Sequence, residues 1–270
     1  MSKPGDGYFL MRQRDRERRR LLRRTVAAAG AAMLAGCDQL SQNESFVEAL
    51  KSAEQLSQVA HKLLVPRTVM AQEFDASHIA KVFRSNGTSD PRDADYKALS
   101  ANHFADYRLE IAGLVRTPVT YSLEQLRAMP SRAQITRHDC VEGWSCIGQW
   151  TGVPLKHVLD AAQPLPEARF VVFRCFDSMD DPDSVQDSHY YESIDLDDAN
   201  HPQTILAYDL NGRPLPVSNG APLRCRVERQ LGYKHAKYVH RIELVTSFAD
   251  IRGGKGGYWE DEGYEWYAGV

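Results

Sequence analysis

The segment ITRHDCVEGWSCIGQWTGVPL occupies residues 135–155 and is the most informative part of this 270-residue chain. It places Cys140 among charged and aromatic side chains and continues into GQWTGVPL, residues 148–155, whose composition is typical of a turn-rich segment. Polar groups at this density are costly to bury unless a ligand or a metal satisfies them. The pattern therefore suits a single thiolate ligand better than a disulfide or a zinc site.

Charge is distributed unevenly along the chain. Residues 1–36 contain nine Lys and Arg against three Asp and Glu, whereas residues 37–270 contain 24 basic and 33 acidic side chains, a net charge of -9. An acidic body argues against nucleic acid or anionic lipid as the main binding partner. A hydrophobic content of 43% is enough for a soluble domain with a sizeable core.

The basic N-terminal part has the order of features found in an export signal. RRRLLR at residues 18–23 fits the twin-arginine pattern, and residues 25–35 form an Ala-rich apolar run. This run is shorter than the roughly 20 residues that span a bilayer. LAGC at residues 34–37 then matches a lipobox, whose cysteine is acylated and becomes the new N-terminus.

These features predict a lipid-anchored domain organisation. We expect residues 1–36 to be a twin-arginine lipoprotein signal peptide, residues 37–75 a lipid-anchored linker and helix, and residues 76–270 the functional domain. Twin-arginine export carries folded proteins, which suits a protein that receives its cofactor in the cytoplasm. The aspartate after the lipobox cysteine resembles the residue that retains such lipoproteins at the inner membrane. We therefore expect a periplasmic protein held at that membrane by lipid alone.

The remaining cysteines give no metal-binding pattern of their own. Four thiols are left after acylation, and in an oxidising compartment they could form two disulfides. Their spacings contain no CxxC, no CxxCH and no paired Cys/His zinc pattern, so we expect neither a structural zinc nor a c-type haem. The four are Cys140, Cys146, Cys175 and Cys225.

Hydrophobic periodicity divides the chain into short strands and a few short helices. Helices are predicted at residues 45–65, 122–129 and 154–162, the second of them with a capping box formed by Ser122 and Gln125. Strands are predicted at residues 107–111, 133–136 (leading into Cys140), 169–175, 203–210, 213–217, 223–227 and 237–245.

The connecting segments complete this picture. Asn211-Gly212 joins two of the strands as a hairpin turn, and residues 83–88 open a polar loop that runs to about residue 97. Residues 178–188 are an acidic surface loop, and the tail, residues 253–270, is an aromatic loop that wraps the body. The mixture predicts a single α+β domain that is mainly β with several short helices.

Two later segments place polar side chains beside turn residues. LPVSNGAPLR at residues 215–224 offers the Asn219 amide for paired hydrogen bonds and the Arg224 fork for a phosphate or a polarised oxygen. GYKHAK at residues 232–237 brings glycine together with three cationic or titratable groups, a candidate anion site in an acidic domain. Either segment alone also fits an ordinary turn or a solvated loop.

The residues alone leave two other interpretations of Cys140 open. It can be a small buried side chain, as many free cysteines are. It can also be a nucleophile with His138 as base, because residues two apart on a strand point to the same face. That pair would need an oxyanion hole and an orienting group, and neither can be identified from the sequence.

Four motifs in order resemble the sulfite oxidase superfamily, most closely the branch that contains the periplasmic methionine-sulfoxide reductase catalytic subunits. The resemblance spans residues 82–245, and ordered motifs are more specific than any one alone. They are RHDCVEGWS at residues 137–145 with WTGVPL at 150–155, NGRPLP at 211–216, NGAPLR at 219–224 and GYKHAK at 232–237.

The resemblance implies mixed sheets and short helices around one molybdenum, bound by a single pyranopterin dithiolene. It implies that Cys140 is the molybdenum ligand, that Cys140, Glu142 and Arg224 act in catalysis, and that Glu142 and Trp144 lie near the open side of the metal. The positions it implies for binding the pterin and its phosphate are Phe83, Asn86, Gly87, Cys175, Asn219, Arg224, His235, Ala236 and Lys237.

One departure from the sulfite-oxidising members bears on the substrate. Those members follow the ligand cysteine with Ala-Gly-Asn-Arg and place the arginine at the sulfite, whereas this chain has VEGW at residues 141–144. A carboxylate there should repel a dianion by about 1–4 kcal/mol. Asn219 also stands where sulfite oxidases usually have histidine. Sulfite is therefore a less favourable substrate than a neutral one.

We therefore expect a periplasmic molybdopterin oxidoreductase with two-electron, oxo-transfer-type chemistry on a small or protein-borne substrate such as a sulfoxide. Its electrons would pass through an external partner, a membrane haem protein or a cytochrome. The alternatives are a sulfite dehydrogenase-like enzyme and a non-catalytic, ligand-binding envelope lipoprotein.

Overall fold

The computed structural model describes residues 43, 45–46, 56, 59, 68–179 and 188–270. The chain divides into two compact units, Met1–Leu64 and Val65–Val270. The four described residues within the predicted helix at residues 45–65 are helical. The predicted export signal, the lipobox and the interior of the acidic loop at residues 178–188 lie outside the described residues.

The second unit consists of short strands joined by short helices and turns. The described helices and 3-10 turns are η1 (Ala76–His78), α3 (Ala94–Ala101), α4 (Leu123–Ala128), α5 (Leu155–Ala162), α6 (Leu196–Ala199), η2 (Val217–Asn219), η3 (Gly232–Lys234) and α7 (Tyr258–Asp261). The described strands are β1 (Arg108–Gly113), β2 (Val119–Ser122), β3 (Arg132–Cys140), β4 (Trp144–Pro154), β5 (Phe170–Ser178), β6 (His189–Asp195), β7 (Ile205–Leu210), β8 (Arg213–Pro214), β9 (Arg224–Arg226) and β10 (Val239–Val245).

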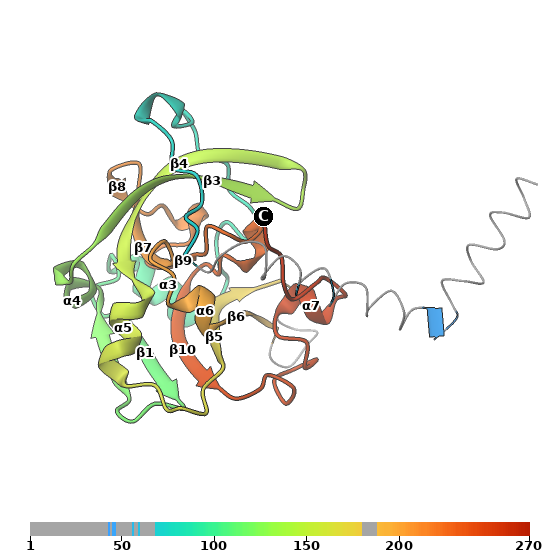
Figure 1. Cartoon of the computed structure of the whole chain (residues 1–270). Helices are drawn as coiled ribbons and strands as arrows, with labels where there is room; N and C mark the ends of the chain where they lie inside the picture. The colour runs from blue at the N-terminus through green and yellow to red at the C-terminus, as the bar shows by residue number, and fades with distance from the viewer. Residues whose placement is uncertain (1–42, 44, 47–55, 57–58, 60–67, 180–187) are drawn as a thin grey trace, which may run out of the picture. The chain divides into compact units, whose positions relative to one another are not determined.

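The strands form two five-stranded sheets. In the first, the order is β2-β1-β10-β5-β6, with β1 parallel to β10 and the other neighbours antiparallel. In the second, β3, β4, β7 and β8 follow one another, and β9 pairs with β7. The predicted mainly-β fold with short helices is confirmed, and the long β3–β4 hairpin extends along the top of Figure 1.

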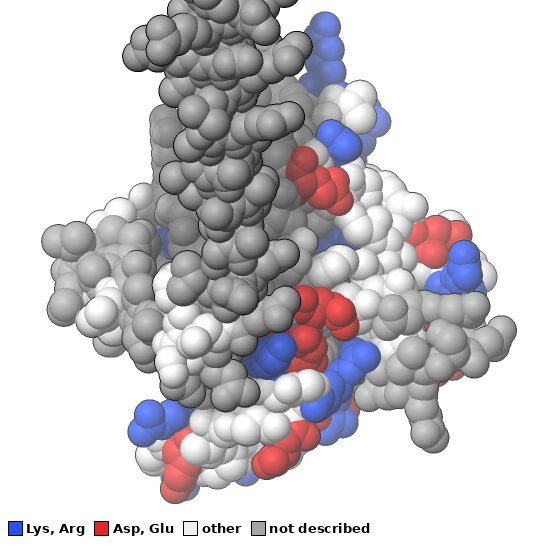
Figure 2. All heavy atoms as spheres, turned by 90° about the vertical axis from the view of Figure 1, so that its right-hand side faces the viewer, with Lys and Arg blue, Asp and Glu red and all other residues white. Residues whose placement is uncertain are grey.

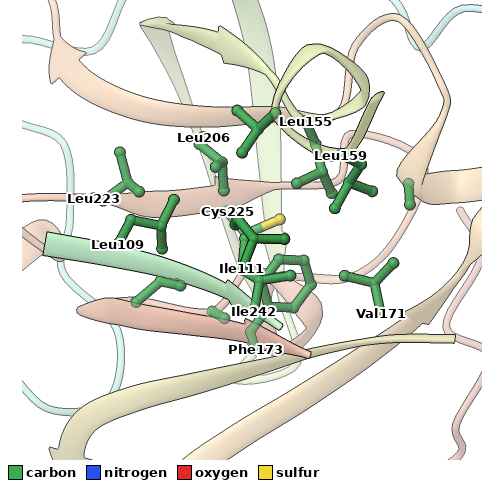
Figure 3. Packing of buried hydrophobic residues seen from close by; sticks show 14 of the residues in the cluster. Leu109, Ile111, Leu155, Leu159, Val171, Phe173, Leu206, Leu223, Cys225 and Ile242 are labelled. Atoms are coloured by element: carbon green, nitrogen blue, oxygen red, sulfur yellow. The ribbon is translucent and has the colours of Figure 1, made fainter. Parts of the chain in front are cut away.

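One hydrophobic core lies between the two sheets and helix α5. Alternate residues of β1 and β5 point into it, including Leu109, Ile111 and Phe173, each with no exposed surface. Figure 3 shows these side chains meeting Leu206 of β7 and Leu159 of α5. Burying side chains of this size contributes about 1.5–3 kcal/mol each, so this core positions the loops that form the site.

The segment after Cys140 differs from the prediction. Residues 148–155 were expected to be turn-rich, but most of them belong to β4, which pairs with β3 on one side and β7 on the other. Gly152 marks close packing here, because a Cβ at that position would lie 2.2 Å from the carbonyl oxygen of Leu206. The sequence alone does not distinguish a glycine that permits two strands to approach closely from a glycine in a turn.

Smaller differences concern element ends. The loop predicted to run to residue 97 ends at α3, because the Asp93 side chain caps that helix by accepting from the Tyr96 N–H at 2.8 Å. The second strand of the predicted Asn211-Gly212 hairpin stops at Pro214, and β6, α6 and α7 were not predicted. The capping box at Ser122 is confirmed.

The C-terminal tail is ordered, as predicted, and contains the short helix α7. Its end is held by backbone hydrogen bonds, from the Leu231 N–H to the Ala268 carbonyl at 2.9 Å and from the Val270 N–H to the Arg229 carbonyl at 3.0 Å. These bonds bring the tail alongside the segment that leads into η3.

Candidate functional site

A cavity of about 150 Å³ opens beside the turn between β3 and β4. Segments far apart in the sequence form its wall: the loop before α3, the β3–β4 turn, the end of β5, the start of β6, the η3 region and the C-terminal tail. The lining residues are Asn86, Gly87, Thr88, Cys140, Val141, Glu142, Asp177, Met179, Tyr190, Gly232, Tyr233, His235, Lys237, Trp259 and Tyr264.

Cys140 is the last residue of β3 and is partly buried at the edge of this cavity. Burial raises the pKa of its thiol. The backbone N–H of Glu142 and the guanidinium groups of Arg224 and Arg84 act in the opposite direction, because each stabilises a thiolate. Cys140 is thus the cavity thiol, held on a rigid strand end and open on one side.

Glu142 lies at the exposed rim of the cavity, as predicted. Its Oε2 accepts a hydrogen bond from Trp144 Nε1 at 2.9 Å, and the Arg84 guanidinium lies 4.9 Å from the centroid of the Trp144 ring. The hydrogen bond keeps the carboxylate beside the cavity mouth.

Arg224 joins two loops behind the cavity. It is fully buried, and its guanidinium donates to the Asn219 carbonyl and to Asn86 Oδ1, both at 3.2 Å. Burial, followed by the charge of Arg226, lowers the pKa of Arg224 to about 9, so it remains protonated at neutral pH. A buried cation thus stands between the two asparagines that the family resemblance assigns to the pterin.

Lys237 fastens the same two loops. Its ammonium donates to the carbonyls of Asn86 at 2.7 Å, Ser218 at 3.2 Å and Thr88. Burial is the main cause that lowers the pKa of Lys237 to about 7, followed by the charge of Arg224. Gly87, in the left-handed region with φ +57°, forms the tip of the loop that Lys237 holds.

The segment GYKHAK at residues 232–237 does not act as one cationic cluster. Lys234 is turned away from the cavity into ion pairs with Glu192 and Glu260. His235 Nε2 lies 2.9 Å from the Val227 carbonyl, and burial holds the pKa of this imidazole well below its usual range, so it is neutral. Of the three predicted groups, only Lys237 places a titratable amine at the cavity wall.

Five of the nine residues that the resemblance assigns to the pterin lie outside the lining of this cavity, and Arg224, behind it, is one of them. Phe83 packs against Trp150 with ring centroids 4.9 Å apart and, with Asn219, borders a second hollow of about 680 Å³. Cys175 and Ala236 are fully buried in the main core. The roles of Cys175 and Ala236 in cofactor binding therefore stay predictions that rest on the resemblance.

His138 cannot serve as the base for Cys140. It is fully buried, and the Arg226 guanidinium donates to its Nδ1 at 2.9 Å. Because arginine has no acceptor, Nδ1 must be the bare nitrogen and the proton sits on Nε2. The interpretation of Cys140 and His138 as a nucleophile–base pair is therefore wrong. All four cysteines in the described part of the chain are free thiols.

Sequence reasoning missed Asp177. This residue of β5 is 3% exposed and lines the cavity, and its Oδ1 has no hydrogen-bond partner. Burial raises its pKa to about 6. It shares the inward face of the strand with Phe173 and Cys175, and an acidic residue at a core-facing position was the available signal. The aromatic residues Tyr190, Trp259 and Tyr264 offered no comparable signal.

Comparison with known proteins identifies the family of this chain. Residues 96–250 match the family model described as oxidoreductase molybdopterin binding domain, which is more than half of the chain. The chain belongs to this family. It is therefore a molybdopterin-binding oxidoreductase of the sulfite oxidase family, and the resemblance noted in its motifs is confirmed.

Relatives of this molybdopterin oxidoreductase include proteins named for methionine-sulfoxide reduction. The chain is 34% identical to the putative protein-methionine-sulfoxide reductase subunit YedZ1 of Azospira oryzae, over 93% of this chain and 87% of that protein. It is 35% identical to the protein-methionine-sulfoxide reductase catalytic subunit MsrP of Ralstonia nicotianae, over 64% of this chain and 53% of that protein. The chain thus spans about half the length of the MsrP proteins it matches.

Among solved structures, the sulfane dehydrogenase SoxCD from Paracoccus pantotrophus aligns with a TM-score of 0.48 at 23% identity, over 55% of this chain and 40% of that chain.

The residues around the cavity fit a molybdopterin. Four buried polar atoms in the cavity lining or behind it have no hydrogen-bond partner within the described structure: Asp177 Oδ1 and His235 Nδ1 in the lining, and Asn219 Nδ2 and Arg224 Nε behind it. Each unsatisfied group costs about 1–3 kcal/mol, so they are expected to bind something. A pterin presents N–H donors and ring acceptors, and its side chain carries a phosphate. Asp177 Oδ1 and His235 Nδ1 can accept hydrogen bonds, and Asn219 Nδ2 and Arg224 Nε can donate them. This set complements the donors and acceptors of a pterin, and the charge of Arg224 complements its phosphate.

Because several histidines are buried as neutral imidazoles, we expect acid to lower the free energy of unfolding. Burial keeps the pKa of His138 and His235 well below 6.5 and lowers that of His240 to about 4. Unfolded histidines bind protons below about pH 6.5, so unfolding takes up protons and stability falls between about pH 6.5 and 4. The raised pKa values of Asp177 and Glu192 oppose this, whereas the lowered pKa of His201 acts in the same direction as those of the three imidazoles. Urea denaturation of the cofactor-free protein at pH 7 and pH 5 measures the loss.

His240→Phe is the matched variant for this prediction. His240 stacks on Phe176 with ring centroids 4.4 Å apart, and phenylalanine keeps that contact but cannot be protonated. The variant should lose less stability than the unmodified protein between pH 7 and pH 5. Equal losses in the two proteins would show that His240 does not remain neutral when folded.

Proposed function

We propose that this chain is the catalytic domain of a sulfoxide reductase that carries one molybdenum on a single pyranopterin dithiolene, with Cys140 as its thiolate ligand. The observation that carries the proposal is the position of Cys140. It is the only cysteine of the described residues that lines the cavity, and two polar atoms without partners, Asp177 Oδ1 and His235 Nδ1, belong to the same lining. A soft thiolate suits a metal that also receives sulfur ligands from a dithiolene.

The chain's own residues hold this cofactor from two sides. Arg224 donates to the side-chain amide oxygen of Asn86 and to the main-chain carbonyl of Asn219, so the Asn86 amide and the turn that carries Asn219 are held in place before the cofactor arrives. Lys237 secures the loop that carries Asn86, and the Arg224 charge offsets that of the phosphate. When bound, the cofactor supplies two-electron oxo transfer.

The outer part of the cavity favours an uncharged substrate. Trp259, Tyr264, Met179 and Val141 give this part an aromatic and apolar character. Sulfur-containing side chains pack well on aromatic rings, with about 0.3–1.5 kcal/mol per contact. A dialkyl sulfoxide has that shape and no net charge. The relatives from Azospira oryzae and Ralstonia nicotianae, both named as methionine-sulfoxide reductase subunits, support the same class of substrate.

Two alternatives are weaker. A sulfite dehydrogenase-like enzyme would bring a dianion past the Glu142 carboxylate at the cavity mouth. A non-catalytic envelope lipoprotein does not agree with membership of a family of molybdopterin-binding oxidoreductases.

The proposed substrate class predicts a clear preference between two reactions. Protein matured in a host that makes the molybdenum cofactor should reduce methionine sulfoxide with an artificial electron donor. It should oxidise sulfite with an artificial acceptor only at a much lower kcat/KM, because like charges repel at the mouth. Steady-state kinetics per bound molybdenum measures both. A higher kcat/KM for sulfite would overturn the proposal.

Glu142→Gln tests whether charge repulsion by the Glu142 carboxylate causes the preference for the sulfoxide over sulfite. Removing the carboxylate should raise kcat/KM for sulfite by about fivefold or more, the equivalent of about 1 kcal/mol in water-like surroundings. The value for the neutral sulfoxide should change little. Equal changes for both substrates would mean that Glu142 acts on the cofactor or the fold and not through charge repulsion.

The electrons are proposed to come from an external redox protein, a membrane haem protein or a cytochrome. Figure 2 shows basic and acidic side chains interspersed on the face that it presents, which fits protein partners better than a nucleic acid. Within the described residues, none of the helices has the length and apolar character required to cross a bilayer. We also propose periplasmic location with a lipid anchor, on the basis of the sequence at residues 18–37, which lies outside the described residues.

A further inference from the structure

A buried cluster of three charged residues lies beside the cavity and has no role in holding the cofactor. Lys234 of η3 donates to Glu192 Oε1 of β6 at 2.5 Å and to Glu260 Oε1 of α7. All three side chains are fully buried. The cluster therefore links the cavity wall to the C-terminal tail.

The charges of this cluster do not balance if both carboxyl groups are ionised. Two carboxylates against one ammonium leave one negative charge without compensation in the interior, which is costly. The two carboxyl groups are also close together, since a Cβ at Gly257 would lie 2.0 Å from Glu260 Oε2 and 2.8 Å from Glu192 Oε1. One carboxyl group must therefore retain a proton at neutral pH.

Glu192 is the better placed of the two to retain it, because its Oε2 lies beside the Tyr190 hydroxyl oxygen, whereas Glu260 Oε2 has no hydrogen-bond partner in the described structure. Burial and then the neighbouring Glu260 raise the pKa of Glu192 well above its usual range, while Lys234 acts in the opposite direction. The titratable groups that interact with Glu192 come from five elements. They are Glu260 of α7, Lys234 and Tyr233 of η3, Tyr190 of the same strand, Cys175 of β5 and Cys225 of β9.

Tyr190 connects this proton to the cavity. Its hydroxyl oxygen lies 3.4 Å from Glu192 Oε2 and donates to the Tyr233 carbonyl at 2.6 Å. Tyr190 also lines the cavity that contains Cys140. The Glu192 carboxyl group can hand its proton to the hydroxyl oxygen once the hydroxyl turns from the Tyr233 carbonyl, its acceptor in this structure, and releases its own proton into the cavity that Tyr190 lines.

We propose that Tyr190 passes a proton from the Glu192 carboxyl group into the cavity during sulfoxide reduction. The proposal rests on the proposed function. In that reaction a sulfoxide takes up two electrons from the external redox protein and two protons; the S–O bond breaks and the oxygen leaves as water, with the sulfide as the other product. Tyr190 supplies one proton, which Glu192 replaces, and solvent at the cavity mouth supplies the other. Glu192 regains its proton from solvent between turnovers.

In this scheme Glu192 acts through Tyr190 and is a positioning and proton-storing residue. Tyr190→Phe should lower kcat for methionine sulfoxide by on the order of a hundredfold, a usual size for loss of a proton donor. Molybdenum content and KM should change little. Glu192→Gln should also slow turnover, and it should remove the fall in kcat that the unmodified enzyme shows as pH rises through the Glu192 titration.

Tyr191→Phe is the matched control. Tyr191 is the next residue on β6 and equally buried, but its hydroxyl donates to Asp261 Oδ2 at 2.5 Å and does not face the cavity. This variant should keep the kcat, the pH profile and the solvent deuterium isotope effect of the unmodified enzyme. Infrared spectra of the folded protein should show a protonated carboxyl band that Glu192→Gln lacks.

The outcomes separate this inference from the proposed function. If the molybdenum-loaded, unmodified protein fails to reduce sulfoxides, the proposed function fails before any variant is compared. If that protein is active and Tyr190→Phe retains its kcat and pH profile, the proton route is wrong. A Glu192→Gln protein that is less stable but has unchanged kcat per molybdenum and an unchanged pH profile would show that the cluster only anchors α7. If Glu192→Gln does not fold, the kcat and pH profile of Tyr190→Phe, compared with those of Tyr191→Phe, decide whether the proton route exists.

Discussion

Replacing Cys140 with alanine should reduce turnover per bound molybdenum by more than about a hundredfold, because changes to outer-shell partners alone cost about 10–100-fold. Cys140 is the thiol at the cavity, and it sits at the end of a paired strand where it cannot move aside. Alanine offers no ligand atom. Molybdenum analysis together with steady-state reduction of methionine sulfoxide measures the effect.

Cys146→Ala is the matched control for this variant. Cys146 lies on β4, is 8% exposed and packs in the smaller hydrophobic cluster with Phe83 and Trp150. Alanine there should cost some stability but should leave molybdenum loading and turnover close to those of the unmodified protein. Loading and activity that survive Cys140→Ala unchanged would remove Cys140 as the ligand.

Replacing Arg226 with leucine should cost about 3–5 kcal/mol of unfolding free energy, the usual penalty for breaking a buried ion pair from one side. Arg226 and Glu228 are fully buried and joined by two hydrogen bonds of 2.9 and 2.6 Å. The arginine also donates to His138 and lies 4.4 Å from the Trp150 ring centroid. Its loss leaves the Glu228 carboxylate without its charged partner. Urea denaturation at pH 7 measures the change.

Two further variants test whether the stability cost of Arg226→Leu arises because its ion pair with Glu228 is buried. Replacing both Arg226 and Glu228 with leucine should recover part of the loss, because the uncompensated charge is then gone. Lys156→Ala breaks the exposed Lys156–Asp160 pair on α5, and it should cost less than about 0.5 kcal/mol. A cost below about 1 kcal/mol for Arg226→Leu would contradict this description of the pair.

Much of the fold was predictable because its signals are local. The alternation in β1, the apolar run in β5 and the Ser122 capping box depend on neighbouring residues, and all three were found. The prediction failed for β4, where Gly152 serves a close approach to β7 and not a turn. Such an approach depends on a strand more than fifty residues further along, so it leaves no local signal.

Only part of the candidate site was predictable from the sequence. Cys140 and Glu142 were found because the motif around them is continuous, and the structure places both at one cavity. The grouping of cationic residues 232–237 was wrong in its chemistry, since Lys234 is neutralised by Glu192 and Glu260 from two other elements. Charge compensation between distant segments cannot be read from spacing.

The amino-acid sequence by itself determined the family and the mainly-β fold and singled out Cys140, because ordered motifs and side-chain periodicity are properties of the linear chain. Only the tertiary structure decided which polar groups are satisfied. It assigned the proton of His138 through Arg226, left Asp177 Oδ1 without a hydrogen-bond partner in the cavity wall, and enclosed Glu192 with Glu260. The physical reason is that burial and the distances between charges set these properties, and both depend on which distant segments the two sheets bring together.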